Sequence, residues 1–514
     1  MNHRTDAPLI DLVADFTASL NAVGPTKDGA SQAPLYHRLR DHLRALILRE
    51  HLSAGARLPA SRVLARDLGV SRTTVELAYD ELVAEGFVAR RRGAGTFVVD
   101  LLPTRPTPPA LPEPDASTLP SSSLSTLGHR LTTLLRYRDA PETPVGFAPC
   151  LPSDDIFPLA AWNRLVTAVL HERGRDLQRS SPLLGDVGLR TALADHLART
   201  RRVQCTPAQL LIVTSTQQAL SLLARVLVDP GDAVWMEDPA YLGARAAFAD
   251  ARLVPVPVDD DGLDVKVGLD AVPDACLAYV TPSHQYPTGV TLSAERRVAL
   301  LDWAAQTGAW IVEDDYDSEF RHVGQPLAPL QSFDRAGRVI YVGTFNKVLF
   351  PGLRLGYVVL PESLVDVIER AVEAFGGQPS ALVQATVAAF VERGHFAAHL
   401  RRTREVYRRR RTALLDAAQT DLGTLVTLGP TDTGLHVCAR LPAHTNDLAV
   451  SARAAAAGLH VPPLSPCYVG PMSSPGLLLG YAGVNEHALR RGVAQLTLLL
   501  RSASSSPTIP PRHE

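Results

Sequence analysis

The feature that most constrains the fold is a series of five short apolar runs in the middle of the chain. Each run is continuously apolar, without the alternation typical of a half-exposed strand, and segments with helical periodicity separate the runs. Strands that are buried on both faces have this character, and connecting helices then cover a mostly parallel sheet. The sequence therefore predicts an α/β domain with strands at Leu210–Val213, Ala233–Met236, Leu277–Val280, Trp310–Val312 and Val339–Val342.

Polar and aromatic side chains follow each of these predicted strands. Because ligands of such sheets bind at the carboxyl ends of the strands, we expect these side chains to share one site. Thr214–Gln218 opens a helix, where free backbone N–H groups and hydroxyls can hold a phosphate. Tyr241 offers an aromatic face to a planar ring. The remaining three strands are followed by Thr281–Gly289, by Asp314 and Tyr316, and by Thr344, Lys347 and Arg354.

Lys347 stands out because the chain has three lysines, the others being Lys27 and Lys266. Arginine carries nearly all the positive charge, so a lysine in this loop suggests chemistry that a guanidinium group cannot perform. An amine forms a Schiff base with the aldehyde of pyridoxal phosphate, a carboxylate keeps the pyridine nitrogen protonated, and an arginine holds the phosphate. A chance surface lysine is the alternative, and the surrounding motif argues against it. The segment 313–354 therefore predicts a pyridoxal phosphate site.

Length and charge indicate more than one domain. A chain of 514 residues exceeds what one core usually supports, so two or three domains are expected. The net charge is −2, yet residues 32–99 carry 11 Arg against 7 Asp and Glu. Only this N-terminal part suits a polyanion. Between Leu101 and Pro114, six of fourteen residues are proline, which predicts an extended linker.

The cysteines and the hydropathy of the chain indicate the cellular compartment and whether a metal site is expected. The five cysteines are scattered with no Cys-x-x-Cys pair, which argues against a disulfide framework or a zinc site, so no metal is expected. The N-terminus has no apolar signal core, and no apolar run is long enough to span a bilayer. A cytoplasmic protein without a membrane partner is the simplest inference.

The N-terminal part has the punctuation of a helix-turn-helix. Apolar residues recur at helical spacing from Pro34, a short helix is expected at 61–68, and Gly69 makes the turn before a third helix capped by Ser71. The strands expected at 87–90 and 96–99 form a basic hairpin suited to the minor groove or the DNA backbone. The start of the third helix would contact base edges and phosphates through Arg72, Thr73 and Thr74.

This pattern resembles the winged-helix domain of GntR-type bacterial regulators. The resemblance rests on Arg57–Val75, Ala78–Gly86 and Gly93–Val98. It implies contact with operator DNA by Arg62, Arg72, Thr74 and the wing around Gly95. Ser71, Thr73 and Arg92 complete the predicted DNA-binding set. Glu76 stands where several relatives carry a basic residue, so base preference is not transferable.

The large domain resembles a fold-type I aminotransferase with a mostly parallel sheet and a smaller C-terminal α+β subdomain. With its GntR-like head, the chain resembles the MocR subfamily of regulators over roughly residues 34–500. The resemblance implies a Schiff base at Lys347, and it pairs Asp314 with the pyridine nitrogen, Tyr316 with the ring hydroxyl and Tyr241 with the ring face. The implied phosphate ligands are Ser215, Thr216, Gln217, Thr344 and Arg354, with Asn346 beside them.

The predicted organisation is a tail at 1–31, the winged helix at 32–99, a linker at 100–140, the aminotransferase-like domain at 141–505 and a disordered tail at 506–514. The family also implies a homodimer. Three departures from the aminotransferase pattern bear on activity. Leu184 replaces an interface tyrosine, residues 477–481 contain no arginine to clamp a carboxylate, and Cys150 replaces a glycine near the substrate entrance.

The sequence thus predicts a pyridoxal phosphate-dependent transcriptional regulator that senses an amine or amino acid. A working aminotransferase with an appended DNA-binding domain is an alternative. A regulator that senses pyridoxal phosphate itself is a third possibility, which the missing carboxylate clamp favours.

Overall fold

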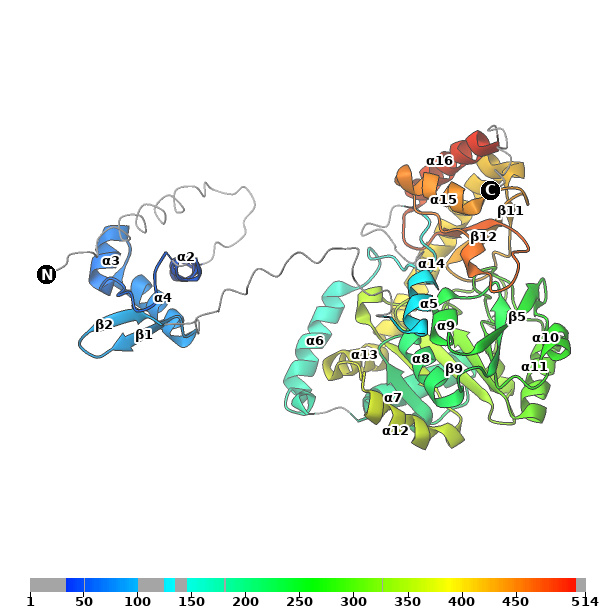
Figure 1. The fold of residues 1–514 in the computed structure, drawn as a ribbon, viewed down its shortest axis with the longest axis horizontal. Coiled ribbons are helices and arrows are strands. Elements are labelled where there is room, and N and C mark those ends of the chain that lie inside the picture. The colour runs from blue at the N-terminus through cyan, green and yellow to red at the C-terminus, as the bar shows by residue number, and fades with distance from the viewer. Residues whose placement is uncertain are drawn as a thin grey trace. The chain divides into compact units, whose positions relative to one another are not determined.

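The computed structural model describes residues 34–49, 51–99, 124–134, 146–179, 182–325 and 327–504. The chain forms two compact units, Met1–Pro120 and Ser121–Glu514 (Figure 1). The tails predicted at 1–31 and 506–514, and most of the predicted linker, lie outside the described residues. Within the predicted linker range, Thr126–Leu134 form helix α5, and Arg130 Nη1 donates to the Ala249 carbonyl at 2.7 Å. This stretch therefore belongs to the larger unit, because its helix contacts that unit.

The described residues of the smaller unit form the predicted three helices and hairpin. The elements are α2 (Leu35–Leu48), α3 (Ser61–Leu68), α4 (Arg72–Ala84), β1 (Val88–Arg91) and β2 (Gly95–Val98). The two strands pair antiparallel from Val88 with Val98 to Arg91 with Gly95, one residue displaced from the expected ranges. The helices share one core, which includes Leu39, Leu43, Leu64, Val75, Ala78 and Leu82.

Two local devices fix the turn between α3 and α4. Gly69 has φ +67°, a left-handed conformation that glycine adopts without a Cβ clash. The Ser71 hydroxyl accepts a hydrogen bond from the Thr74 backbone N–H at 3.1 Å, which caps the start of α4. The first turn of α4 is therefore held in a defined orientation at the surface of this unit.

The larger unit is built on an eight-stranded sheet. The strand order is β3-β10-β9-β8-β7-β4-β5-β6, and the strands are parallel except for β10 and β6. All five predicted strands are confirmed, as β3, β4, β7, β8 and β9. The bounds are β3 (Leu210–Val213), β4 (Ala233–Asp238), β5 (Arg252–Asp259), β6 (Gly262–Leu263), β7 (Leu277–Val280), β8 (Trp310–Asp315), β9 (Val339–Thr344) and β10 (Gly356–Val359).

Helices cover both faces of this sheet. Successive residues of a strand point to opposite faces and therefore pack into different hydrophobic cores. On β4, Trp235 stacks on Trp303 with ring centroids 4.0 Å apart, whereas Val234 and Met236 belong to the core on the opposite face. One face carries α8 (Thr216–Leu227), α9 (Leu242–Ala247) and α12 (Val365–Phe375). The other carries α7 (Val187–Arg201), α10 (Val265–Ala271), α11 (Ala294–Thr307) and α13 (Ala381–Glu392), with α6 (Leu159–Arg173) packed on α13.

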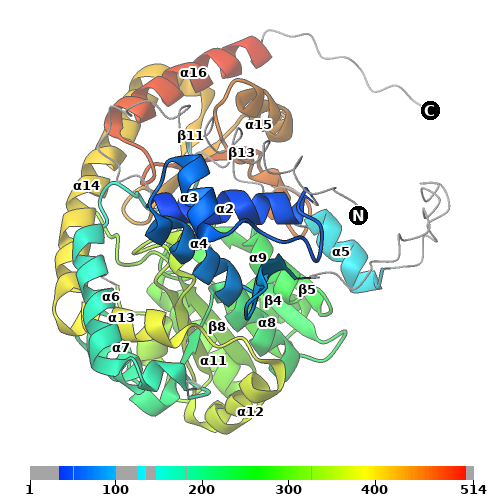
Figure 2. The same ribbon diagram turned by 90° about the vertical axis from the view of Figure 1, so that its left-hand side faces the viewer.

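The smaller C-terminal α+β subdomain is confirmed. Its antiparallel sheet has the order β11-β12-β13, and Figure 1 shows it with α15 and α16 at one end of the larger unit. Figure 2 shows the long α14 running along the side of this unit up to α16. The elements are α14 (His395–Ala417), β11 (Thr427–Leu428), β12 (His436–Arg440), α15 (Asp447–Ala456), β13 (Gly476–Gly480) and α16 (Glu486–Ser504). Among the described residues, no helix is long and apolar enough to cross a membrane.

Candidate functional site

Asp314 is buried near the end of β8, and only one of its two carboxylate oxygens accepts a hydrogen bond. Its Oδ2 accepts a hydrogen bond from the Tyr279 hydroxyl at 2.8 Å, while Oδ1 is buried without a hydrogen-bond partner. Burial raises the pKa of this carboxyl to about 7, and the Tyr279 hydrogen bond and the Lys347 ammonium oppose the rise. An unsatisfied buried acceptor is costly, so this geometry suits a ligand that brings a positively charged N–H donor. The protonated ring nitrogen of pyridoxal phosphate is such a donor.

Three aromatic side chains and a histidine lie around the same region. The Tyr316 hydroxyl is 2.9 Å from His284 Nδ1, and that nitrogen is 3.0 Å from Asp317 Oδ2. The rings of Tyr286 and Tyr316 are 6.0 Å apart, and Tyr286 also meets the Tyr241 ring edge-on at 5.7 Å. Burial raises the pKa of the Tyr316 hydroxyl well above its ordinary value, so it remains protonated at neutral pH. These side chains can enclose a planar ring and offer polar groups to its substituents.

Ser215, Thr216 and Gln217 form the start of α8, as predicted. The Ser215 hydroxyl caps the helix by accepting from the Gln218 N–H at 3.1 Å, and Gln217 Nε2 donates to the Gly243 carbonyl at 2.8 Å. First-turn N–H groups have no partner within a helix, and together with the helix dipole they attract anions. This helix start is therefore suited to a phosphate.

Strand β10 connects the end of β9, which carries the predicted phosphate ligand Thr344, with this helix start. It lies between β3 and β9, and Gly356 pairs with both Val213 and Thr344. A Cβ on Gly356 would lie 3.7 Å from the Ser215 carbonyl carbon and 3.0 Å from the Gly343 oxygen, so only a glycine leaves this approach open. Thr344 at the end of β9 thus comes close to Ser215.

The loop after β9 is held by its own hydrogen bonds. Asn346 Oδ1 accepts from the Leu355 N–H at 3.0 Å, and the Asn346 N–H donates to the Thr344 hydroxyl at 3.1 Å. Arg354 is exposed and has φ +52°, a left-handed conformation. Asn346 therefore has a positioning role within the loop that carries Lys347 and Arg354.

Lys347 is half-buried in this loop. Burial is the main cause of the shifted pKa values of Asp314, Cys150 and His436, and the Lys347 ammonium contributes electrostatically to all three. The amine therefore lies near the Asp314 carboxyl and near a cluster formed by Cys150 and His436. The predicted amine, carboxylate and phosphate ligands all lie at or just after the carboxyl ends of parallel strands, on the same side of the sheet.

Several residues of this region were absent from the predicted set. His284 and Tyr286 belong to the segment Thr281–Gly289, whose place after a predicted strand was the available signal. Tyr279 was part of a predicted strand, but nothing in the apolar pattern marked its hydroxyl as a partner of Asp314. Asp317 and His436 carried no signal of a shared site, because their proximity depends on the fold of the C-terminal subdomain.

The departures from the aminotransferase pattern have structural counterparts. Leu184 is buried in the core beneath α8, and its carbonyl accepts from the Ile212 N–H at 2.9 Å. Residues 476–480 form the fully buried strand β13, and the Tyr481 hydroxyl is 2.8 Å from His322 Nε2. Neither segment presents a charged group to bind a substrate carboxylate.

In the smaller unit, the predicted DNA-binding residues Arg62, Ser71, Arg72, Thr73, Arg92 and Gly95 are exposed, and Thr74 is half-buried. Arg72 Nη2 pairs with Glu76 Oε1 at 2.7 Å, one turn along α4. Glu76 therefore orients Arg72 and reduces the positive charge that this helix offers to DNA. A Cβ on Gly95 would lie 2.9 Å from Arg57 Nε, which places a further arginine beside the wing.

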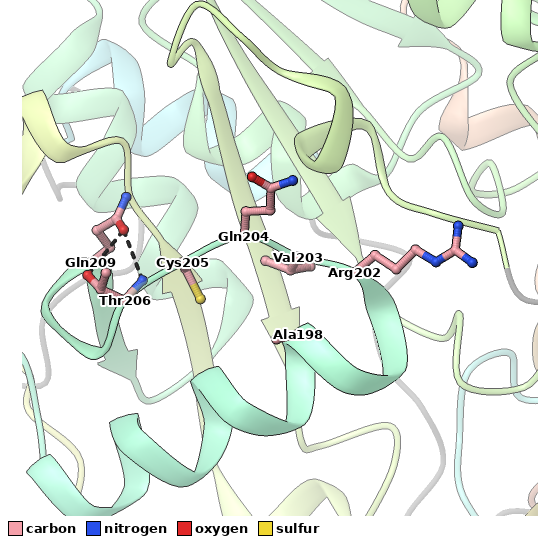
Figure 3. Close-up of a pocket in the computed structure, with 7 residues that line it drawn as sticks. All are labelled: Ala198, Arg202, Val203, Gln204, Cys205, Thr206 and Gln209. Atoms are coloured by element: carbon pink, nitrogen blue, oxygen red, sulfur yellow. Dashed lines mark hydrogen bonds between the residues drawn. The ribbon is translucent and has the colours of Figure 1, made fainter.

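Figure 3 shows a surface hollow that is separate from this site. It lies between the end of α7 and the amino end of β3, and a hydrogen bond from the Thr206 N–H to Gln209 Oε1 closes one side. The hollow contains none of the predicted cofactor ligands, which lie at the carboxyl ends of the strands. Its lining residues are Ala198, Arg202, Val203, Gln204, Cys205, Thr206 and Gln209.

Comparisons with known proteins agree with the two-unit architecture. Residues 154–496 match the family Aminotransferase class I and II, and residues 35–98 match the family Bacterial regulatory proteins, gntR family. The chain is 39% identical over 492 residues to the probable rhizopine catabolism regulatory protein MocR of Rhizobium meliloti, a match that covers 94% of this chain and 97% of that protein.

One further relative matches nearly the whole chain, and one solved structure resembles the larger unit. The HTH-type pyridoxine biosynthesis transcriptional regulator PdxR of Corynebacterium glutamicum is 31% identical, over 95% of this chain and 99% of that protein. The larger unit is similar to the crystal structure of LysN, the alpha-aminoadipate aminotransferase of Thermus thermophilus, complexed with N-(5'-phosphopyridoxyl)-L-leucine. That similarity has a TM-score of 0.66 and 28% identity, and it covers 74% of this chain and 100% of that one.

Proposed function

This chain belongs to the MocR-type family of GntR transcriptional regulators, and we propose that it binds operator DNA through its smaller unit and pyridoxal phosphate through its larger unit. The observation that carries the cofactor proposal is the buried, unpartnered Oδ1 of Asp314, with the Lys347 amine nearby. The LysN complex supports it, because that protein holds a phosphopyridoxyl compound in the same fold.

Each part of the cofactor has a matching group in this chain. When bound, pyridoxal phosphate supplies an aldehyde that reacts with amines and a ring that withdraws electrons. Lys347 would attach it covalently, Asp314 would accept from its ring nitrogen, and Tyr316 would donate to its ring hydroxyl. Tyr241 would stack on the ring, and the start of α8 would hold the phosphate, joined by Thr344 and Arg354.

A small amine is the proposed effector. It would compete with Lys347 for the aldehyde, release the lysine and change the charge within the site. A ligand shifts an equilibrium between two states by its differential affinity for them, so this exchange can favour one DNA-binding state. The name of PdxR connects that relative to pyridoxine biosynthesis, which supports a second candidate, a regulator that senses pyridoxal phosphate itself.

The visible absorption spectrum of the purified full-length protein tests the cofactor proposal. Pyridoxal phosphate is added first, followed by a panel of amines and amino acids. A band of the lysine-bound cofactor that one amine perturbs identifies that amine as effector. A band that no amine perturbs favours sensing of pyridoxal phosphate, and repeated turnover with a keto acid would show an aminotransferase instead. Absence of any band at saturating cofactor would refute the proposed site.

DNA from the region upstream of the protein's own gene tests the regulator proposal. Because phosphate contacts are strongest at low salt, binding of the full-length protein is measured there first. We expect Arg72→Ala to weaken binding about 10-fold, equivalent to about 1.4 kcal/mol. Arg179→Ala is the control, because this exposed arginine lies in the larger unit. Equal affinities of both variants and the parent would contradict a role for α4.

A further inference from the structure

Three buried side chains from distant segments form a cluster with metal-ligand chemistry. Cys150, Asp317 and His436 each offer one ligand atom, and these atoms lie within 4.8 Å of one another. The side chains are 5%, 1% and 0% exposed. The cluster lies beside the proposed cofactor site, since Asp317 contacts His284, which contacts Tyr316. We propose that these three residues form a binding site for Zn²⁺.

The separation between the thiol and the imidazole fits tetrahedral zinc. With Zn–S and Zn–N bonds of about 2.3 and 2.0–2.1 Å, two ligands of a tetrahedral ion lie about 3.6 Å apart. The observed distance from Cys150 Sγ to His436 Nδ1 is 3.7 Å. With the ring proton on Nε2, the Cys150 thiol can donate to this nitrogen, and zinc would take the place of the thiol proton, which passes to solvent. The pair is therefore set at zinc-ligand spacing before any metal binds.

The ligands are held by the contacts usual around metal sites. His436 Nε2 is 3.1 Å from the Pro287 carbonyl, and donation there leaves the Nδ1 lone pair toward the thiol. Metal-binding histidines usually donate their other ring N–H to a carbonyl or carboxylate in this way. Asp317 is oriented by the Leu435 N–H at 3.2 Å and by His284 Nδ1.

The backbone at Cys150 has an uncommon conformation. Its φ of +57° is a left-handed conformation that glycine adopts without strain and that a cysteine adopts at a cost. A strained residue in a buried polar cluster is typical of a functional position. Thiolate, imidazole and carboxylate together suit zinc, and three protein ligands leave a fourth position open for a small ligand, as in catalytic zinc sites.

This inference is independent of the proposed function, because its test uses neither pyridoxal phosphate nor DNA. Full-length protein is titrated with Zn²⁺ against a chromophoric chelator, and with Co²⁺ to detect a thiolate-to-metal absorption band. We expect one zinc per chain and a thiolate band. Cys150→Gly should weaken zinc binding by at least about 100-fold, since loss of a residue that merely orients a metal ligand already costs about 10–100-fold.

Two variants remove proposed zinc ligands, and a third serves as a control. Glycine is compatible with φ +57°, so Cys150→Gly should fold, which circular dichroism verifies. His436→Gln should also weaken zinc binding, whereas Cys276→Ala should not, because this half-buried thiol precedes β7 at the opposite end of the strands. Equal zinc affinity of the parent and Cys150→Gly, or a Co²⁺ complex without a thiolate band, would overturn the proposal.

Discussion

At the scale of single residues, Lys347 is the group on which the cofactor proposal depends most. Replacing it with alanine should abolish the absorption band of the attached cofactor, because no other described lysine lies near Asp314. Lys266→Ala is a matched control, since this exposed lysine pairs with Asp270 at 2.6 Å on α10. Spectra of the three proteins with equal pyridoxal phosphate provide the measurement. A band retained in Lys347→Ala would assign the attachment elsewhere.

Asp314 should make the cofactor-free protein sensitive to pH. Its pKa is raised from 3.8 to about 7 in the folded chain, so the folded state binds more protons than the unfolded state between these values. Its contribution to the free energy of unfolding therefore falls as pH rises through this range. Without cofactor, Asp314→Asn should be more stable than the parent at a pH of about 8, by about 1–3 kcal/mol, and the difference should shrink at a pH of about 5.

Denaturant unfolding of the two cofactor-free proteins at both pH values measures this difference. Asparagine can still accept from the Tyr279 hydroxyl, so the comparison isolates the charge. The same variant should bind pyridoxal phosphate more weakly, because a neutral amide stabilises a protonated ring nitrogen less than a carboxylate does. A variant that is less stable than the parent at both pH values would contradict the assigned charge effect.

At the scale of elements, the start of α4 depends on one cap. Ser71→Ala removes the hydroxyl that accepts from the Thr74 N–H and should cost about 1 kcal/mol of local stability. Ser71→Asn should restore it, because asparagine caps equally well. Hydrogen exchange of the α4 amides in the full-length protein measures the effect. Unchanged exchange in Ser71→Ala would show that packing alone holds this helix.

The elements also show what the sequence could predict. Continuous apolar runs identified five of the six parallel strands, and the glycine and serine positions located the helix-turn-helix. Strand β5 was missed because Pro255 and Pro257 interrupt its pattern, and β10 because its four residues directly follow the cofactor loop. The predicted ligands could still be named, since each follows a predicted strand. The cluster of Cys150, Asp317 and His436 could not be predicted, because cysteine spacing says nothing about contacts between distant segments.

At the scale of the whole molecule, we expect two copies of the chain to assemble and bind DNA together. We expect the full-length protein to be a homodimer that reads paired half-sites, because symmetric dimers of helix-turn-helix proteins do so. Light scattering should give the mass of two chains, and footprinting should show two protected segments. A monomer that binds a single half-site would contradict this expectation.

Effector binding to the larger unit should change the DNA affinity of the smaller unit by a predictable amount. Allosteric free energies are typically about 1–3 kcal/mol, so a saturating effector should change DNA affinity by about 5–150-fold in cofactor-loaded protein. Lys347→Ala should keep its DNA affinity but lose this response, because Lys347 lies in the larger unit and the predicted DNA contacts lie in the smaller one. Titration of labelled operator DNA with both proteins, with and without effector, measures the coupling. A response that persists in Lys347→Ala would separate regulation from the attached cofactor and place the sensor at another site.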